Sequence, residues 1–144
     1  MKQRTNKTKR ITIVFIAVIC MVMIASISVA AKTYTSTHTV SVASVSGSSD
    51  VYYATMGKKG RMSDTFSNYP TVFDGKTTSN DKARAVNETT GKTYSWKSFT
   101  LNSNSSAPTT VVYGNSLAKG SYRITYKYVS GGGFRASSIL SKTY

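Results

Sequence analysis

The sequence contains a single cysteine and a single histidine, and it is poor in acids: five Asp and Glu stand against 19 Lys and Arg in 144 residues. One cysteine cannot form an intramolecular disulfide framework. One Cys and one His cannot supply the three or four such ligands of a usual zinc site. We therefore expect neither a disulfide-stabilised scaffold nor a zinc protein, and no cofactor.

The reactive groups needed for common hydrolytic mechanisms are also scarce. The only histidine, His38, lies in a threonine-rich stretch without a GxSxG motif, although a Ser-His-Asp triad would have to include it. We interpret it as a half-buried or surface strand residue. A glycosidase would need two facing carboxylates. We assign the central acids to loops, a strand start and a turn (Asp64 and Asp74, Asp81, Glu88), and expect a protein that is not an enzyme.

The longest apolar run lies at the N-terminus. "MKQRTNKTKR" carries five basic residues and no acid, and residues 11–25 that follow are apolar except for Thr12. Small residues then precede Ala30 and Ala31. This pattern predicts a signal peptide over residues 1–30, cleaved after Ala30 or Ala31. An uncleaved anchor over the 21 residues 11–31 is the alternative, and the polar chain that follows favours cleavage.

The remaining residues 31–144 are long enough for one domain with its own core. They hold 14 Lys and Arg and five acids, a formal net charge of +9. The only cysteine, Cys20, lies in the predicted signal peptide. A basic leader followed by a cysteine-free chain is typical of a bacterial protein, so we expect a secreted, extracellular protein that associates with the cell wall.

Residues 31–144 are rich in Ser, Thr, Tyr and Val and show no helical apolar period, which favours an all-β fold. We predict an antiparallel β-sandwich of about seven or eight strands, preceded by an N-terminal signal helix. The strands are expected at Thr33–Val45, Val51–Met56, Pro70–Phe73 (a weak edge strand), Lys82–Asn87, Thr93–Leu101, Thr109–Tyr113, and in a closing hairpin that joins Gly120–Gly133 to Phe134–Leu140.

One irregularity is expected inside this pattern. The large side chains change parity between Trp96 and Phe99, and one extra residue at Lys97 or Ser98 would return them to one face. We therefore predict a β-bulge there.

The segment "GSYRITYKYV" places Tyr122, Tyr126 and Tyr128 on one face of a strand, with Arg123 and Lys127 on the other. An apolar face opposite a charged face is typical of an antiparallel strand with one side on the core. We expect the tyrosines to face the core and Trp96 to be a buried anchor. The alternative is an exposed platform of Trp96, Tyr122, Tyr126 and Tyr128 that stacks on sugars.

Basic residues form the other candidate site. Lys58, Lys59 and Arg61 lie in a glycine-flanked loop, and Arg123 and Lys127 share a strand face. The loop can be an ordinary solvated turn. Clustered cations can also bind anionic polymers or lipid headgroups, each contributing about 1 kcal/mol near an acidic surface and less as salt rises. Nucleic acid is not expected, because export removes the protein from it and no nucleic-acid-binding motif is present.

Two functions follow from these features. The first is a secreted, cationic, non-enzymatic β-sandwich that associates with anionic or glycan surfaces, either cell-wall polymer or membrane headgroups. The second is a secreted antagonist, either bacteriocin-like or an inhibitor of another protein. Growth inhibition by the purified protein would distinguish the second from the first.

Overall fold

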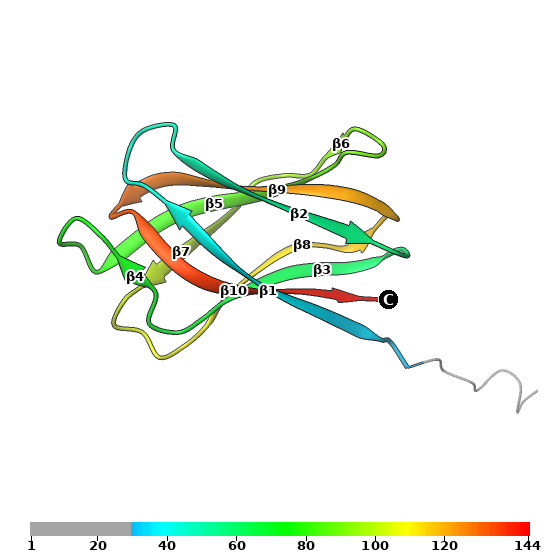
Figure 1. Cartoon of the computed structure of the whole chain (residues 1–144), viewed down its shortest axis with the longest axis horizontal. Helices are drawn as coiled ribbons and strands as arrows, with labels where there is room; N and C mark the ends of the chain where they lie inside the picture. Colours follow the sequence, from blue (N-terminus) through cyan, green and yellow to red (C-terminus); the bar gives the residue numbers. More distant parts are fainter. Residues whose placement is uncertain (1–29) are drawn as a thin grey trace, which may run out of the picture. The chain divides into compact units, whose positions relative to one another are not determined.

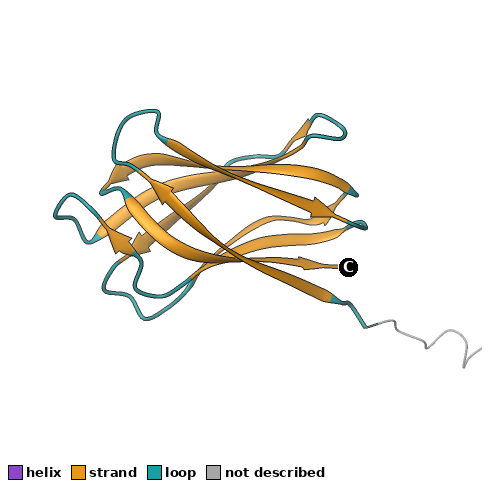
Figure 2. Ribbon diagram, in the orientation of Figure 1, coloured by secondary structure: helices purple, strands orange, loops and turns teal. Residues whose placement is uncertain are grey.

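The computed structural model describes residues 30–144, which form two antiparallel β-sheets and contain no helix (Figures 1 and 2). The predicted signal helix lies in residues 1–29, outside the described part, and it stays a prediction, as do the cleavage after Ala30 or Ala31 and the alternative anchor over residues 11–31. No helix able to cross a membrane is found in residues 30–144. The predicted all-β sandwich is confirmed.

Each sheet has five strands. Sheet A has the order β1-β10-β3-β8 with β4 beside β10, and sheet B has the order β2-β9-β5-β6 with β7 beside β5. Eight strands have six or more residues, and β4 and β6 have two. The bounds are β1 Thr33–Val42, β2 Ser49–Met56, β3 Gly60–Phe66, β4 Thr71–Val72, β5 Thr78–Asn87, β6 Lys92–Thr93, β7 Lys97–Asn102, β8 Thr109–Leu117, β9 Gly120–Gly131 and β10 Phe134–Thr143.

The core lies between the sheets and is filled by alternate residues of each strand. Tyr122, Ile124 and Tyr126 of β9 are fully buried, as predicted for this face. Phe66 of sheet A stacks on Phe99 of sheet B at 4.9 Å between ring centroids. Full burial of one such side chain stabilises a fold by about 1.5–3 kcal/mol. Residues 32–144 form a compact unit that contains the core side chains of the described part of the chain.

The predicted closing hairpin is wrong. β9 belongs to sheet B and β10 to sheet A, so they face each other across the core instead of pairing. The chain crosses between sheets at Gly131–Gly133, where it runs against other backbone. A Cβ on Gly131 would lie 2.4 Å from the Thr78 carbonyl oxygen, and Gly131 has a φ of 91°. Three glycines are therefore needed for a sheet-to-sheet crossover, and not for a tight turn within one sheet.

Two local predictions hold with adjustments. β5 pairs Val86 with Thr93 and Ala83 with Lys97, so the partner strand holds one residue more than β5 over this stretch. That extra residue lies between Thr93 and Lys97, just before the predicted position, and divides the arm into β6 and β7. The weak edge strand is present as β4, which pairs only with β10.

Candidate functional site

Two turns that are far apart in sequence meet at one end of the sandwich. Met56 at the end of β2 pairs with Gly120 at the start of β9, and Gly60 at the start of β3 pairs with Leu117 at the end of β8. The β2–β3 and β8–β9 connections are therefore neighbours (Figure 1). Their lysines, separated by some 60 positions in the chain, come to the same place.

Lys32 and Tyr144, at the two ends of the sandwich's chain, lie at the same end of the molecule as these two connections. The backbone of Lys32 exchanges two hydrogen bonds with that of Tyr144, at 2.9 and 3.1 Å. Tyr144 packs beside the basic loop, where a Cβ on Gly60 would lie 2.2 Å from the Thr143 carbonyl oxygen. Only glycine permits this approach, which fixes the base of the loop bearing Lys58 and Lys59 against β10.

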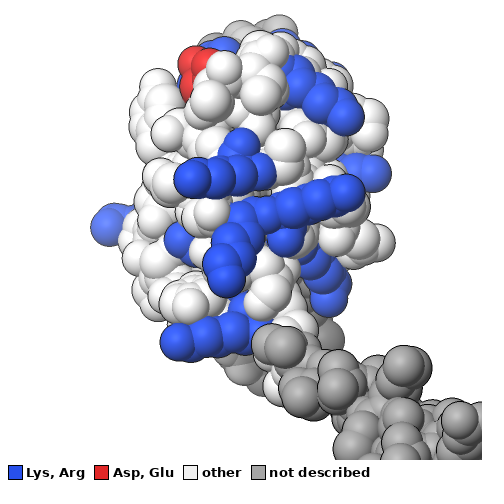
Figure 3. Space-filling model, turned by 90° about the vertical axis from the view of Figure 1, so that its right-hand side faces the viewer, with Lys and Arg blue, Asp and Glu red and all other residues white. Residues whose placement is uncertain are grey.

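Seven cations gather on these segments, and we call this group the cationic end. Figure 3 views the molecule from this side and shows Lys and Arg spread over most of the visible face, with acidic atoms confined to one margin. Six of the seven are exposed and Lys142 is half-buried. The members are Lys32, Lys58, Lys59, Arg61, Lys92, Lys119 and Lys142.

The acids of the described residues do not neutralise this end. Asp64 and Asp81 are buried in the core. Asp50 accepts a hydrogen bond from the Ser41 backbone at 2.9 Å, near the other end of β1, and Asp74 bonds Ser44 in the same region. Among the acids that are not buried, the one nearest in sequence to a member of the cationic end is Glu88, four positions before Lys92, and it already pairs with Arg123 at 2.8 Å.

The predicted basic residues thus separate into two groups. Lys58, Lys59 and Arg61 lie together in the cationic end. Arg123 is paired with Glu88, which raises the pKa of its guanidinium. Lys127 lies seven residues along β9 from Gly120, about 23 Å away, directly opposite Lys82.

Four members of the cationic end were not predicted: Lys32, Lys92, Lys119 and Lys142. Lys119 stands in a short turn before Gly120, which is a visible signal for a loop lysine. Nothing in the sequence indicates that this turn lies beside the β2–β3 loop, since that depends on the order of strands in each sheet.

The alternative of an exposed aromatic platform loses two of its four rings, and the prediction that the tyrosines face the core is confirmed for these two. Tyr122 and Tyr126 expose none of their surface, so neither ring can contact a ligand. Tyr128 is half-buried and donates its hydroxyl to the Gly131 carbonyl at 3.1 Å. The interpretation of Trp96 as a buried anchor is also wrong. It is half-buried and lies outside the core cluster.

Trp96 is instead covered by cations. The Lys82 ammonium and the Arg84 guanidinium lie 5.2 and 4.5 Å from its ring centroid. Both side chains leave the outer face of β5, where the extra residue of the β6–β7 arm places the indole over them. A sugar that stacked on the ring face covered by these cations would have to displace at least one of them, which costs a cation–π contact of about 0.5–1 kcal/mol.

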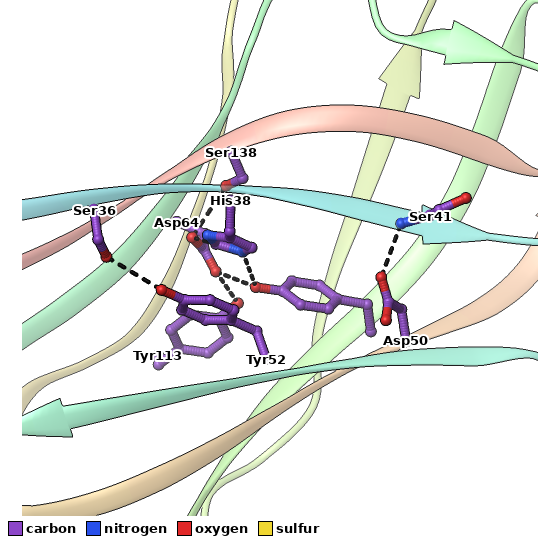
Figure 4. Close-up of polar contacts among 9 residues, drawn as sticks. Ser36, His38, Ser41, Asp50, Tyr52, Asp64, Tyr113 and Ser138 are labelled. Atoms are coloured by element: carbon purple, nitrogen blue, oxygen red, sulfur yellow. Dashed lines mark hydrogen bonds and ion pairs between the residues drawn. The ribbon is translucent and has the colours of Figure 1, made fainter.

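A second polar cluster lies inside the sandwich and contains the only histidine (Figure 4). Asp64 of β3 is fully buried and accepts hydrogen bonds from the hydroxyls of Tyr113 at 2.8 Å, Tyr126 at 2.5 Å and Ser138 at 3.0 Å. The Nε2 atom of His38 lies 3.0 Å from the Tyr126 hydroxyl and 3.8 Å from Asp64.

The electrostatics of this cluster favour a neutral histidine and neutral tyrosines around the carboxyl group. Burial is the largest effect on His38 and lowers the pKa of its imidazole, although Asp64 opposes the shift. Burial together with Asp64 raises the pKa of the Tyr126 and Tyr113 hydroxyls well above their ordinary value. The ring of His38 stacks on Tyr52 at 3.8 Å, with the planes 9° apart.

This cluster has residue types that could form a catalytic site, but its geometry is that of a core. Asp64 and Ser138 expose none of their surface, so a substrate cannot contact them. Three hydroxyl groups donate to a carboxyl group that would be costly to bury alone. We conclude that the cluster stabilises the fold.

The assignment of Asp64 to a loop is corrected by this position in β3. A sequence signal for it exists, because Asp64 shares parity with Met62 and Phe66, both of which face the core. Asp81 is corrected in the same way: it lies within β5, is 1% exposed, and accepts a hydrogen bond from Ser79 at 2.6 Å. Burial raises the pKa of its carboxyl to about 6.

No protein-family model matches this chain, and no curated protein sequence matches it. Several solved structures are similar in fold. One is a family 35 carbohydrate-binding module from an environmental isolate, 21% identical over 67% of this chain and 66% of that one, with a TM-score of 0.43. Another is the CBM36-1 domain of a multidomain xylanase from the hindgut metagenome of Trinervitermes trinervoides, 11% identical over 74% and 96%, with a TM-score of 0.44.

A ruminal GH26 endo-β-1,4-mannanase also matches, at 16% identity over 69% of this chain with a TM-score of 0.41. The chain spans only 19% of that enzyme's length. Similarities at these identities and TM-scores concern the β-sandwich architecture, and they assign neither a ligand nor an activity to the cationic end.

Proposed function

We propose that this protein is a secreted, non-enzymatic protein that binds an anionic polymer of the cell surface through its cationic end. The observation that carries the proposal is the charge distribution. Seven cations converge there from the β2–β3 and β8–β9 connections and from the adjoining ends of β1, β3, β6 and β10. The acids of the described residues are buried, paired or placed at the opposite end.

The physical basis is additive but salt-dependent attraction. A cation near an acidic surface contributes about 1 kcal/mol, and the interaction is screened beyond about 8 Å at physiological ionic strength. Three cations in contact with phosphates or carboxylates of a polymer would therefore change its affinity by up to about a hundredfold. Flexible, exposed lysines such as Lys58, Lys59 and Lys119 suit a polymer with repeated charges, because they do not require one fixed ligand geometry.

Catalysis is not part of the proposal. The only histidine is engaged with Tyr52, Tyr126 and Asp64, and the two carboxyl groups nearest the core are inaccessible to a substrate. An aromatic stacking platform is also not part of it, since Tyr122 and Tyr126 are buried, Tyr128 is half-buried and Trp96 has two cations over its ring.

The test compares two variants of equal net charge in residues 32–144. Lys58→Gln/Lys59→Gln/Lys119→Gln removes three charges from the cationic end, and Lys76→Gln/Lys97→Gln/Arg135→Gln removes three from elsewhere. We expect retention on purified anionic wall polymer to fall at least about tenfold more for the first variant than for the second. Equal losses would show that only net charge matters and would contradict a localised site.

Binding of the parent protein and of the two variants to lipid vesicles distinguishes a polymer ligand from a lipid ligand. Binding to vesicles rich in anionic lipid, without retention on the wall polymer, would reassign the ligand to membrane headgroups. Retention that does not weaken between low and high salt would remove the electrostatic basis altogether.

A further inference from the structure

Within residues 30–144, the sandwich has one long strand edge that no other segment covers, on β1. Sheet A ends in β1 and β8, and sheet B ends in β2 and in the β6–β7 arm. An exposed strand edge presents unpaired N–H and C=O groups that can pair with another chain, and proteins usually block such edges with charges, bulges, prolines or short strands.

The other edges carry such features. β2 has the Lys142 ammonium on the Thr55 carbonyl oxygen at 3.3 Å and the Asp50 carboxylate on the Val51 N–H at 2.8 Å. The pairing of β8 with β3 shifts register twice between Gly60 and Ser63. The β6–β7 arm is interrupted between Thr93 and Lys97.

The direction of the β1 backbone groups follows from its pairing. Lys32 and Tyr144 exchange both hydrogen bonds, so even-numbered residues of β1 bond to β10 and odd-numbered residues point away from it. The odd residue Ser41 confirms this parity, because its N–H is capped by Asp50 from outside the ladder. Among the described residues, the backbone groups of Thr33, Thr35, Thr37 and Thr39 have no such cap, and we call them the free edge.

The free edge is suited to regular pairing. β1 and β10 keep one register over all ten residues of β1, without a bulge. The sequence "TYTSTHT" over it contains no Lys, Arg, Asp, Glu, Pro or Gly. Its four threonines are exposed on the outer face of sheet A, and threonine pairs across strands are favourable.

We propose that the free edge binds the same edge of a second copy of this chain, forming an antiparallel dimer about a two-fold axis at Ser36. In this register Thr33 pairs with Thr39 of the second copy and Thr35 pairs with its Thr37, so every uncapped group of one edge meets one of the other. About eight backbone hydrogen bonds form, and the two A sheets become continuous.

The free edge is complementary to itself, because its uncapped groups are symmetric about Ser36 and its segment carries no charged side chain, so a second copy is the occupant. The chain carries a formal net charge of +9 over residues 31–144, which disfavours self-association. The antiparallel arrangement separates the charge, because the cationic end lies at the Thr33 end of β1. The two Thr33 residues would be about 20 Å apart along the strands, with the cationic ends beyond them on opposite sides. If the proposed polymer binding is correct, the dimer would be bivalent.

The test uses sedimentation velocity of residues 32–144 from micromolar to millimolar concentration, without any polymer, so its result is independent of the proposed function. We expect a reversible dimer. Thr37→Pro removes an N–H of the free edge and no hydrogen bond to β10, and should weaken dimerisation at least about tenfold. The matched control is Thr55→Pro on the edge of β2, which should dimerise as the parent does.

The register is tested by charge. Thr35→Lys/Thr37→Lys and Thr35→Glu/Thr37→Glu should each be monomeric and should form a heterodimer when mixed, because position 35 faces position 37 in the pair. Slow hydrogen exchange of the Thr35 and Thr37 amides in the parent dimer would support the same edge. A parent that stays monomeric, a dimer unaffected by Thr37→Pro, or charge variants that do not form a heterodimer would overturn the proposal.

Discussion

The buried carboxyl group of Asp81 should make the stability of this fold depend on pH. Asp81 is 1% exposed, its Oδ2 atom accepts the Ser79 hydroxyl at 2.6 Å, and its Oδ1 atom has no partner within the described residues. Burial raises its pKa from 3.8 to about 6, with the Ser79 hydrogen bond opposing the shift. The folded state therefore binds the proton more tightly than the unfolded state does.

The direction and size of the pH effect on stability follow from the difference between the pKa of Asp81 in the folded and in the unfolded state. Below about pH 4 the group is protonated in both states and imposes no pH-dependent cost. As pH rises from about 4 to about 6, the unfolded state ionises first and the folded state loses stability. A difference of about two pKa units corresponds to about 3 kcal/mol at neutral pH.

The perturbation is Asp81→Asn, which cannot ionise. Burying its amide has a cost of its own, but that cost is the same at both pH values and cancels in the comparison. Urea unfolding at about pH 4 and about pH 7 should show the variant gaining about 2–3 kcal/mol on the parent between the two. A stability difference between variant and parent that is unchanged with pH would show that folding does not raise the pKa of Asp81.

Three further perturbations test the core. Asp64→Asn should lower the free energy of unfolding by about 2–4 kcal/mol, because both carboxyl oxygens accept from hydroxyls and an amide keeps only one of these acceptors; an unchanged urea midpoint would contradict this. The pKa of His38 is lowered by burial, so its contribution to stability is present above about pH 6.5 and lost as pH falls; an NMR titration giving a raised value would reverse it. Gly131→Ala should cost about 2 kcal/mol or more through backbone strain, measured by thermal unfolding.

The fold class could be predicted from the sequence because it depends on local patterns. Alternating Val, Tyr and Ile residues indicate strands, and the parity change after Trp96 revealed an extra residue to within a few positions. The closing hairpin could not be predicted correctly. Two strands joined by a short glycine-rich link can pair or can face each other across a core, and only the backbone contacts of Gly131–Gly133 decide between these.

Only the part of the candidate site that depends on local sequence could be predicted. Lys58, Lys59 and Arg61 are neighbours in sequence, and their clustering needed no knowledge of the fold. Lys119 and Lys142 join them only because of strand order, which depends on contacts between distant segments. The buried position of Asp64 had a local signal in its parity with Met62 and Phe66, and that signal was outweighed by the usual preference of acids for loops.

Chemical-shift mapping on residues 32–144 is the most direct test of whether an anionic polymer binds at the cationic end. The expected result is amide shifts concentrated in residues 57–61, 117–120 and 142–144 as wall polymer is added, reversed by salt. Shifts centred on Trp96 and Lys127, or no shifts at low salt, would contradict it.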